Sequence, residues 1–217
     1  MKNIKTRGLE ILFLALLIGA VVLALSVVRF AVLPGEESIE RAVKSIDHPA
    51  FEGLMKVTTF IASQEFSIII IAILFVLLWF RGHKPESVFI IIAGLNGIFC
   101  AIIKVAVQRI RPSWGEIATF WDYSFPSGHV MNLVVLYGFI IYVAWILWGN
   151  VSSKRAFLLF LLIFLVVFTG VSRIYLGAHW FSDVIGAYLF GGCYLVALIW
   201  SYKHQKAKRK KFNTLLI

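Results

Sequence analysis

An arginine, a histidine and an aspartate occur together in residues 172–183, SRIYLGAHWFSD, between two strongly apolar runs. His179 and Asp183 are four residues apart, so on a helix their side chains would lie on one face. The carboxylate can then accept the N–H of one imidazole nitrogen and leave the other nitrogen as a nucleophile or base. Arg173 adds a permanent planar cation that suits phosphate oxygens. The alternative is a structural ion pair between helix ends, because buried ion-pair networks also occur without catalytic function.

A second basic cluster occupies residues 104–112, KVAVQRIRP. Lys104 and Arg111 are seven residues apart, or two helical turns, so both are expected to face one anion. Pro112 then takes the chain out of the helix. Basic residues beside an apolar run most often extend to the membrane interface, and this is the alternative interpretation.

The third cluster is FPSGH, residues 125–129, which immediately precedes another apolar run. Ser127 is placed to cap the helix that follows, and Gly128 lets the backbone approach a ligand closely. The N–H groups at a helix start favour an anion. His129 is well placed there to give a proton to a leaving oxygen. The alternative is an ordinary helix cap followed by an incidental histidine.

The composition places these charges in a membrane protein. Of the 217 residues, 60% are hydrophobic and 15% are charged, and the mean hydropathy is +0.89. A water-soluble domain of this size cannot bury so much apolar surface. The net charge of +10 comes from basic residues that flank apolar runs, so it does not indicate a nucleic-acid partner.

We expect an all-α integral membrane fold with six transmembrane helices in one bundle, forming a single domain over residues 1–217. Each apolar run is long enough to cross a hydrocarbon core of about 30 Å as a helix. In the segment 34–62, apolar residues recur at helical spacing among charges, which fits either short amphipathic helices on the membrane surface or a solvated loop. The six spans are expected at about Ile11–Val28, Ser63–Phe80, Ser87–Ile103, Val130–Trp148, Phe157–Val171 and Phe181–Trp200.

The lysine and arginine residues orient these spans. Thirteen of the 21 basic residues lie near the N-terminus, in two loops, and in the C-terminal segment that includes a basic tail at 204–217. The positive-inside rule places this side, with both termini, in the cytoplasm. The first span also resembles a signal peptide with small residues at 24–26, but its apolar run is rather long, so a retained helix is favoured.

On this topology the three clusters meet at the outer face of the membrane. Lys104 and Arg173 end outward-going spans, whereas His129 and His179 precede or begin inward-going ones. If each cluster had a separate structural role, nothing would predict that all three lie at the same face of the membrane. A cage of cations beside two histidines suits phosphoryl transfer, which depends on positioning and on neutralising the phosphate oxygens.

The order and spacing of the clusters resemble the three-part signature of the type-2 phosphatidic-acid phosphatase superfamily. The resemblance spans residues 104–183, and the six-helix layout extends it over nearly the whole chain. The positions that carry it are Lys104, Arg111, Pro112, Pro126, Ser127, Gly128, His129, Ser172, Arg173, His179 and Asp183.

The resemblance implies a role for each of these side chains. His179 would attack phosphorus with Asp183 orienting it, and His129 would protonate the leaving oxygen. Water would then release phosphate from the phosphohistidine. The phosphoryl oxygens would be held by Lys104, Arg111, Ser127, Gly128 and Arg173.

The expected protein is therefore a multi-pass lipid phosphate phosphatase of the cell membrane with its active site on the extracytoplasmic face. Undecaprenyl diphosphate, phosphatidylglycerol phosphate and phosphatidic acid all suit such a site. The sequence contains no tight cluster of carboxylates, histidines or cysteines for a metal, so catalysis is expected without a metal or other cofactor. No obligatory protein partner is indicated.

Three alternatives share the anion cage. A phosphotransferase would pass the phosphate to an acceptor other than water. A vanadate-dependent peroxidase is disfavoured because those relatives are soluble. A non-catalytic lipid-phosphate binder or transporter would need the cage but not the pairing of His179 with Asp183, so the intact pair argues against it.

Overall fold

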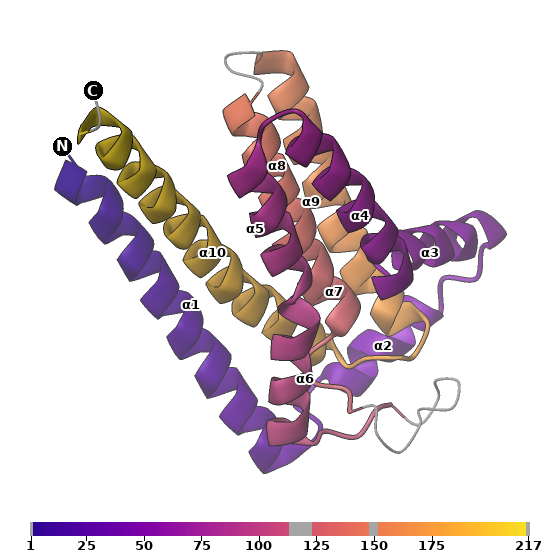
Figure 1. Cartoon of the computed structure of the whole chain (residues 1–217). Helices are drawn as coiled ribbons and strands as arrows, with labels where there is room; N and C mark the ends of the chain where they lie inside the picture. The colour runs from indigo at the N-terminus through magenta and orange to yellow at the C-terminus, as the bar shows by residue number, and fades with distance from the viewer. Residues whose placement is uncertain (1, 113–122, 148–151, 216–217) are drawn as a thin grey trace.

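The computed structural model describes residues 2–112, 123–147 and 152–215, and the regular secondary structure in these ranges is entirely helical. The two terminal helices, α1 (Lys2–Phe30) and α10 (Phe181–Leu215), pack against each other. Both chain ends lie at the same end of the bundle (Figure 1). The segment predicted as a basic tail continues α10 as a helix through Leu215.

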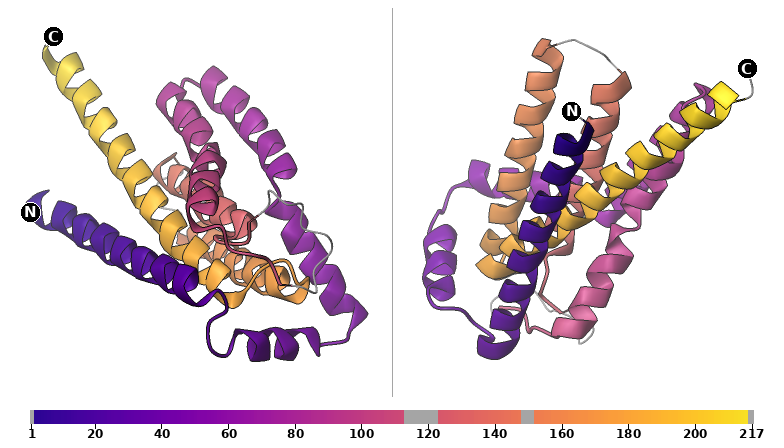
Figure 2. Two further views of the ribbon diagram at one scale, coloured as in Figure 1. Left: turned by 90° about the horizontal axis from the view of Figure 1, so that it is seen from below. Right: turned by 90° about the vertical axis from the view of Figure 1, so that its left-hand side faces the viewer.

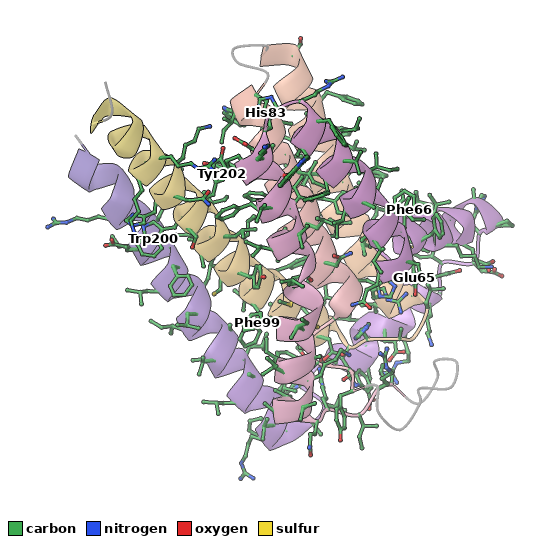
Figure 3. The ribbon with its side chains drawn as sticks, in the orientation of Figure 1. Glu65, Phe66, His83, Phe99, Trp200 and Tyr202 are labelled. Atoms are coloured by element: carbon green, nitrogen blue, oxygen red, sulfur yellow. The ribbon has the colours of Figure 1, made fainter. Side chains whose placement is uncertain are left out.

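The rest of the bundle is formed by shorter helices that run between its two ends. The helices α5 and α6 follow each other around Leu95 and together make one apolar stretch of 24 residues, Lys84–Val107. His83, which immediately precedes this stretch, and Phe99, in α6, lie well apart along it (Figure 3). The bounds of these helices are α4 (Gln64–Phe80), α5 (Lys84–Gly94), α6 (Asn96–Val107), α8 (Gly138–Leu147) and α9 (Ser152–Tyr175).

Five helical stretches in the described residues are long and apolar enough to cross a membrane. They coincide with the first and the last four predicted spans. Their bounds are Arg7–Phe30, Lys84–Val107, Gly128–Leu147, Ala156–Tyr175 and Phe181–Arg209.

The second predicted span differs from the other five. It corresponds to α4, which has 17 residues and reaches span length only together with α3 (Pro49–Ile61), from which it is bent by 50°. The bend falls where α3 ends at Ile61 and α4 starts anew, with the Ser63 hydroxyl accepting the Phe66 N–H at 3.2 Å. The predicted span Ser63–Phe80 thus corresponds to α4 alone, and α3 lies in the segment 34–62, where short helices are one of the two expectations.

Two short helices, α2 (Glu36–Lys44) and α3, connect α1 to α4 and form an arm at the edge of the bundle (Figure 2). Pro49 is the first residue of α3, where its missing N–H costs nothing, and His48 Nδ1 accepts the Ala50 N–H at 3.2 Å. Whether these helices lie on a membrane surface stays a prediction.

A buried polar network fixes the helix that begins after the FPSGH segment. This helix consists of α7 (Gly128–Asn132), a π-helical segment η1 (Leu133–Tyr137) and α8. Asn132 donates to the Ala62 carbonyl at 3.1 Å and to the Ser67 hydroxyl at 2.6 Å, and it accepts from Asn96 at 3.2 Å. The bend between α3 and α4 frees the Ala62 carbonyl, and Asn132 satisfies it away from water. His129, one helical turn before Asn132, is thereby held in place.

Candidate active site

The three clusters meet at the end of the bundle away from the chain termini, beside α2 (Figure 1). The Ser127 N–H donates to the main-chain oxygen of Asp183 at 3.1 Å, which joins the FPSGH segment to the start of α10. Arg111 donates to the Ala178 carbonyl at 2.8 Å, which joins the segment after α6 to the turn between α9 and α10. The predicted convergence at one end of the bundle is therefore present in the structure.

His179 lies in the turn between α9 and α10. Gly177, with a φ of 65°, closes α9: its N–H donates to the Ile174 carbonyl, and the Ala178 N–H donates to the Arg173 carbonyl. This is the Schellman arrangement, which needs a residue that tolerates positive φ. The His179 N–H also donates to the Arg173 carbonyl, at 3.1 Å, and its side chain is only 2% exposed. The expectation that His179 and Asp183 share a helical face is therefore wrong, because α10 begins only at Phe181.

Asp183 instead meets His179 by capping α10. One carboxylate oxygen, Oδ2, accepts the N–H of Trp180, the residue before the helix, at 2.8 Å. The same oxygen lies 3.5 Å from His179 Nδ1, a distance that suits electrostatic attraction but is long for a hydrogen bond. The carboxylate thus faces one ring nitrogen of the histidine.

The other ring nitrogen of His179 faces a cation. Arg111 Nη1 lies 3.4 Å from Nε2. An arginine can only donate, so this contact assigns Nε2 as the acceptor and leaves the ring proton on Nδ1, toward Asp183. This is the tautomer that a nucleophilic Nε2 requires.

The structure corrects the path by which Arg111 reaches the site. The helix α6 ends at Val107, and Gln108 adopts a left-handed conformation with a φ of 52°. Arg111 is therefore not two turns from Lys104 on one helix but extends from the segment that follows it. Trp180 Nε1 donates to the Ile110 carbonyl at 3.1 Å and ties this segment to the turn.

The two remaining predicted cations also approach this region. Lys104, in the last turn of α6, donates to the Tyr123 carbonyl. Arg173, in the last turn of α9, is 9% exposed and donates to the Thr59 hydroxyl at 3.4 Å. The charges of both act on His179, together with those of Arg111 and His129, so all four side chains lie within electrostatic range of it.

These surroundings keep His179 neutral. Burial lowers its pKa well below the usual 6.5, and the positive charges of Arg173, Arg111, Lys104 and His129 lower it further. A neutral imidazole keeps the lone pair that nucleophilic attack needs.

The FPSGH segment supplies a donor without a partner. Ser127 occupies the N-cap position of α7, but its side chain makes no capping hydrogen bond, so the expectation of a side-chain cap is wrong. Its Oγ is fully buried and has no hydrogen-bond partner among the described residues. A buried hydroxyl without a partner is costly unless a ligand satisfies it. A Cβ added at Gly128 would lie 3.8 Å from the Cys100 sulfur, an ordinary van der Waals contact, so packing within the protein leaves room for a side chain there.

Arg109 and Glu36, for which the sequence predicts no role, also lie at the site. Arg109 is 4% exposed and donates to Asp183 Oδ1 at 2.5 Å and to Glu36 Oε2 at 2.6 Å. Arg109 lies inside the 104–112 cluster, where it is the third cation at a helix end predicted to face outward. Because positive charge is not expected on that side of the membrane, this position could have drawn attention to Arg109. Nothing in the sequence distinguishes Glu36 from the other acids of the segment 34–62.

The site combines a neutral histidine, a carboxylate behind it and a set of cations in front of it. Such an arrangement can bind a phosphate group and attack its phosphorus atom. Within the described ranges, no group of three or more histidine, cysteine, aspartate or glutamate side chains is placed to hold a metal ion.

Comparison with known proteins identifies the family. The long apolar helices define a multi-pass helical membrane protein. A model of the PAP2 superfamily matches residues 85–207, which is more than half of the chain, so the protein belongs to the PAP2 superfamily.

Two curated relatives are similar over most of the chain. Phosphatidylglycerophosphatase B of Bacillus subtilis (strain 168) is 26% identical over 171 residues, which cover 78% of this chain and 84% of that protein. Lipid A 1-diphosphate synthase of Escherichia coli (strain K12) is 27% identical over 166 residues, which cover 65% of this chain and 64% of that protein.

A solved structure has the same fold. The crystal structure of a transmembrane PAP2-type phosphatidylglycerolphosphate phosphatase from Bacillus subtilis matches with a TM-score of 0.79 and 23% identity. The match covers 88% of this chain and 96% of that chain. It supports the predicted all-helical transmembrane fold.

Proposed function

We propose that this protein is a membrane phosphatase that removes a terminal phosphate from a lipid phosphate or diphosphate through a phosphohistidine intermediate. The observation that carries the proposal is the placement of His179 between two opposite charges. Arg111 lies 3.4 Å from its Nε2, and Asp183 lies 3.5 Å from its Nδ1. The proposed nucleophile thus has an orienting carboxylate at one ring nitrogen and a cation suited to phosphate at the other.

In the first step, His179 Nε2 forms a bond to phosphorus while the bond from phosphorus to the leaving oxygen breaks. Asp183 attracts the Nδ1 proton and stabilises the positive charge that develops on the ring. His129 gives its proton to the leaving oxygen. Lys104 and Arg111, among other groups, neutralise the phosphoryl oxygens as the transition state forms.

In the second step, water attacks the phosphorus atom and the bond to Nε2 breaks. His129, now neutral, accepts a proton from the water, so the enzyme returns to its starting protonation state. Arg173 and the Ser127 hydroxyl hold the phosphoryl group through both steps. The buried Oγ of Ser127 supports this role, since the described residues offer it no other partner.

The substrate class follows from the membrane setting and the relatives. One relative is named for phosphatidylglycerophosphate, a glycerolipid phosphate. Phosphatidylglycerol phosphate is therefore the first candidate, and undecaprenyl diphosphate and phosphatidic acid remain candidates because they present the same phosphate group on a lipid tail. The protein is expected to act in the bilayer without an obligatory protein partner or a metal ion.

We place the active site on the extracytoplasmic face of the cell membrane. The chain termini and the basic tail lie at one end of the bundle, and the site lies at the other (Figure 1). The positive-inside rule assigns the basic end to the cytoplasm.

A phosphotransferase is the second candidate, and one observation favours it. The Escherichia coli relative is named as a lipid A 1-diphosphate synthase, a name that denotes formation of a diphosphate. The same phosphohistidine would serve both reactions, and only the acceptor would differ. A binder or transporter without chemistry leaves the alignment of His179 and Asp183 unexplained.

The test is phosphate release by purified protein in detergent from phosphatidylglycerol phosphate, phosphatidic acid and undecaprenyl diphosphate, with excess EDTA present. We expect release from at least one lipid, inhibition by orthovanadate and no loss in EDTA. Transfer of labelled phosphate to a second lipid instead of water would favour the phosphotransferase. Absence of both reactions, with intact lipid-phosphate binding, would favour the binder.

A further inference from the structure

Arg109 lies where four segments of the chain meet. Its Nη1 donates to the Ser182 hydroxyl at 2.7 Å and to Asp183 Oδ1 at 2.5 Å. Its Nη2 donates to Glu36 Oε2 at 2.6 Å, and its Nε donates to the Ala31 carbonyl at 2.8 Å. Arginine is the side chain suited to this position, since its donors point in several fixed directions from one plane.

The carboxylate of Asp183 divides its two oxygens between different tasks. Oδ1 accepts from Arg109, whereas Oδ2 accepts the Trp180 N–H and faces His179 Nδ1. Contacts at both oxygens fix the rotation of the carboxylate plane. Without Arg109, the carboxylate would lose its charged contact at Oδ1, and the alignment with Nδ1 would loosen.

Glu36 in turn holds Arg109 against the start of α10. Its Oε1 accepts the Ser182 N–H at 2.9 Å and the Ser182 hydroxyl at 2.5 Å, and its Oε2 accepts the Leu33 N–H at 2.6 Å as well as Arg109. The Glu36 side chain is only 3% exposed, although it is a carboxylate on α2, a short helix at the edge of the bundle. A buried acid with four hydrogen bonds is a fixed part of the network.

We propose that Arg109 is a positioning residue for phosphoryl transfer: through the Asp183 carboxylate it fixes the orientation of His179, and Glu36 holds Arg109 in place. The inference rests on the proposed function, and it adds a link from α2 to the nucleophile. Arg109 itself contacts Asp183 and not His179 in the structure, so its influence passes through the carboxylate.

The positive charge of Arg109 should also affect the pH at which His179 is protonated, an effect that a purely structural role would not have. Arg109 offsets part of the negative charge of Asp183. The carboxylate therefore stabilises the doubly protonated, positively charged form of His179 less than it would without Arg109. Removing the cation makes it easier for the coupled pair of Asp183 and His179 to take up a proton. The protonation of His179 should then occur at higher pH.

The first experiment compares Arg109→Gln with Arg41→Gln, in which an exposed arginine on α2 is changed in the same way. With phosphatidylglycerol phosphate in mixed micelles, we expect Arg109→Gln to lower kcat by about 10- to 100-fold and to change KM little. A loss of this size is typical when a residue that orients a functional side chain is removed. Arg41→Gln should match the wild-type protein. Unchanged kcat in a folded Arg109→Gln protein, or a loss confined to KM, would overturn the proposal.

Two further variants test the route through Asp183. Arg109→Lys keeps the charge but not the fork of donors, so its kcat should lie between those of Arg109→Gln and the wild type. In an Asp183→Asn background, Arg109→Gln should add little to the loss already present. Additive losses in the double variant would show that Arg109 does not act through Asp183.

A titration that needs no turnover separates this proposal from the proposed function. Nuclear magnetic resonance of histidine-labelled protein, with His179→Gln for assignment, reports the pH at which His179 becomes protonated. We expect this midpoint to be higher in Arg109→Gln and unchanged in Arg41→Gln, and an equal midpoint in all three proteins would overturn the positioning role. Should Arg109→Gln not fold, Glu36→Gln, which keeps the side-chain shape, carries the same test: kcat should fall, and the midpoint should move down, because a nearby negative charge is lost while Arg109 keeps its positive charge. If the wild-type protein acts on no lipid phosphate, the proposed function fails while the titration still decides the role of Arg109.

Discussion

The main-chain oxygen of Asp183 accepts the Ser127 N–H at 3.1 Å, while the side chain of Asp183 faces His179. One residue therefore faces His179, the proposed nucleophile, and also holds the turn that carries Ser127 and His129. This contact sets the distance between the two segments that carry the histidines.

The Ser127 hydroxyl should matter for catalysis and not for folding. Its Oγ has no hydrogen-bond partner among the described residues, so Ser127→Ala removes no internal hydrogen bond. We expect kcat/KM to fall by about 100-fold, the loss typical when one donor to a transition-state oxygen is removed. The apparent melting temperature in detergent should stay the same.

Ser26→Ala is a matched control for this variant, because Ser26 lies on α1 and its hydroxyl donates only locally, to the Val22 carbonyl at 2.8 Å. Wild-type activity in Ser127→Ala would show that the hydroxyl holds no phosphoryl oxygen.

The close approach of α10 to the FPSGH segment should be intolerant of a single methyl group. A Cβ on Gly186 would lie 2.4 Å from the Phe125 ring, which is fully buried next to Pro126. Gly186→Ala should therefore displace Phe125, lower the stability by about 1–3 kcal/mol and reduce activity. Gly53→Ala on α3, where a Cβ meets nothing within 4 Å, is the control. Thermal unfolding in detergent measures the difference, and equal melting temperatures would contradict the packing described.

The pH dependence should reflect a histidine that stays neutral. Because burial and nearby cations lower the pKa of His179 well below 6.5, the reactive neutral form persists as the pH falls through 6.5 and is lost only at lower pH. The substrate phosphate also ionises near pH 6. We therefore propose to follow the rate at which diethyl pyrocarbonate, which acylates neutral imidazole, modifies His179 itself, measured from the mass of the peptide that contains it. A midpoint at or above pH 6.5 would contradict the assigned environment of His179.

Single cysteines should report which face of the membrane carries the site. Cys100 and Cys193 are buried, so labelling of the parent protein should be low. Ser45, after α2 at the site end, and Ser153, at the start of α9 at the other end, are exposed. In intact cells, a membrane-impermeant maleimide should label Ser45→Cys, and it should label Ser153→Cys only after permeabilisation. The reverse pattern would place the active site in the cytoplasm.

Much of the fold follows from hydropathy alone. A membrane-spanning helix satisfies its own backbone, so a long apolar run is enough to locate it, as for Phe157–Val171 within α9. What hydropathy does not predict is the tertiary contact that secures the break before α4. Asn132 satisfies the Ala62 carbonyl that the bend leaves open, and the two residues are 70 positions apart in sequence. Only the folded chain brings them together.

The sequence predicts which side chains converge but not how they are arranged. Residue types and spacing single out His179, Asp183 and the cations, and the folded chain brings them to one end of the bundle, while their catalytic roles stay predictions. The expectation of shared helical faces was wrong at both places where a turn intervenes, after Val107 and after Tyr175. Glu36 was missed because its partner Ser182 is 146 positions away, and only the folded chain brings them together.

If His179 becomes phosphorylated during turnover, rapid quenching of the purified protein with ³²P-labelled phosphatidylglycerol phosphate should trap the intermediate. We predict a transient label on the wild-type protein that is stable to base and labile to acid, as a phosphoramidate bond is. The label should be absent in His179→Ala, and it should decay as inorganic phosphate appears. A label that survives in His179→Ala, or turnover by that variant above roughly a tenth of the wild-type rate, would contradict the assignment of His179 as the nucleophile.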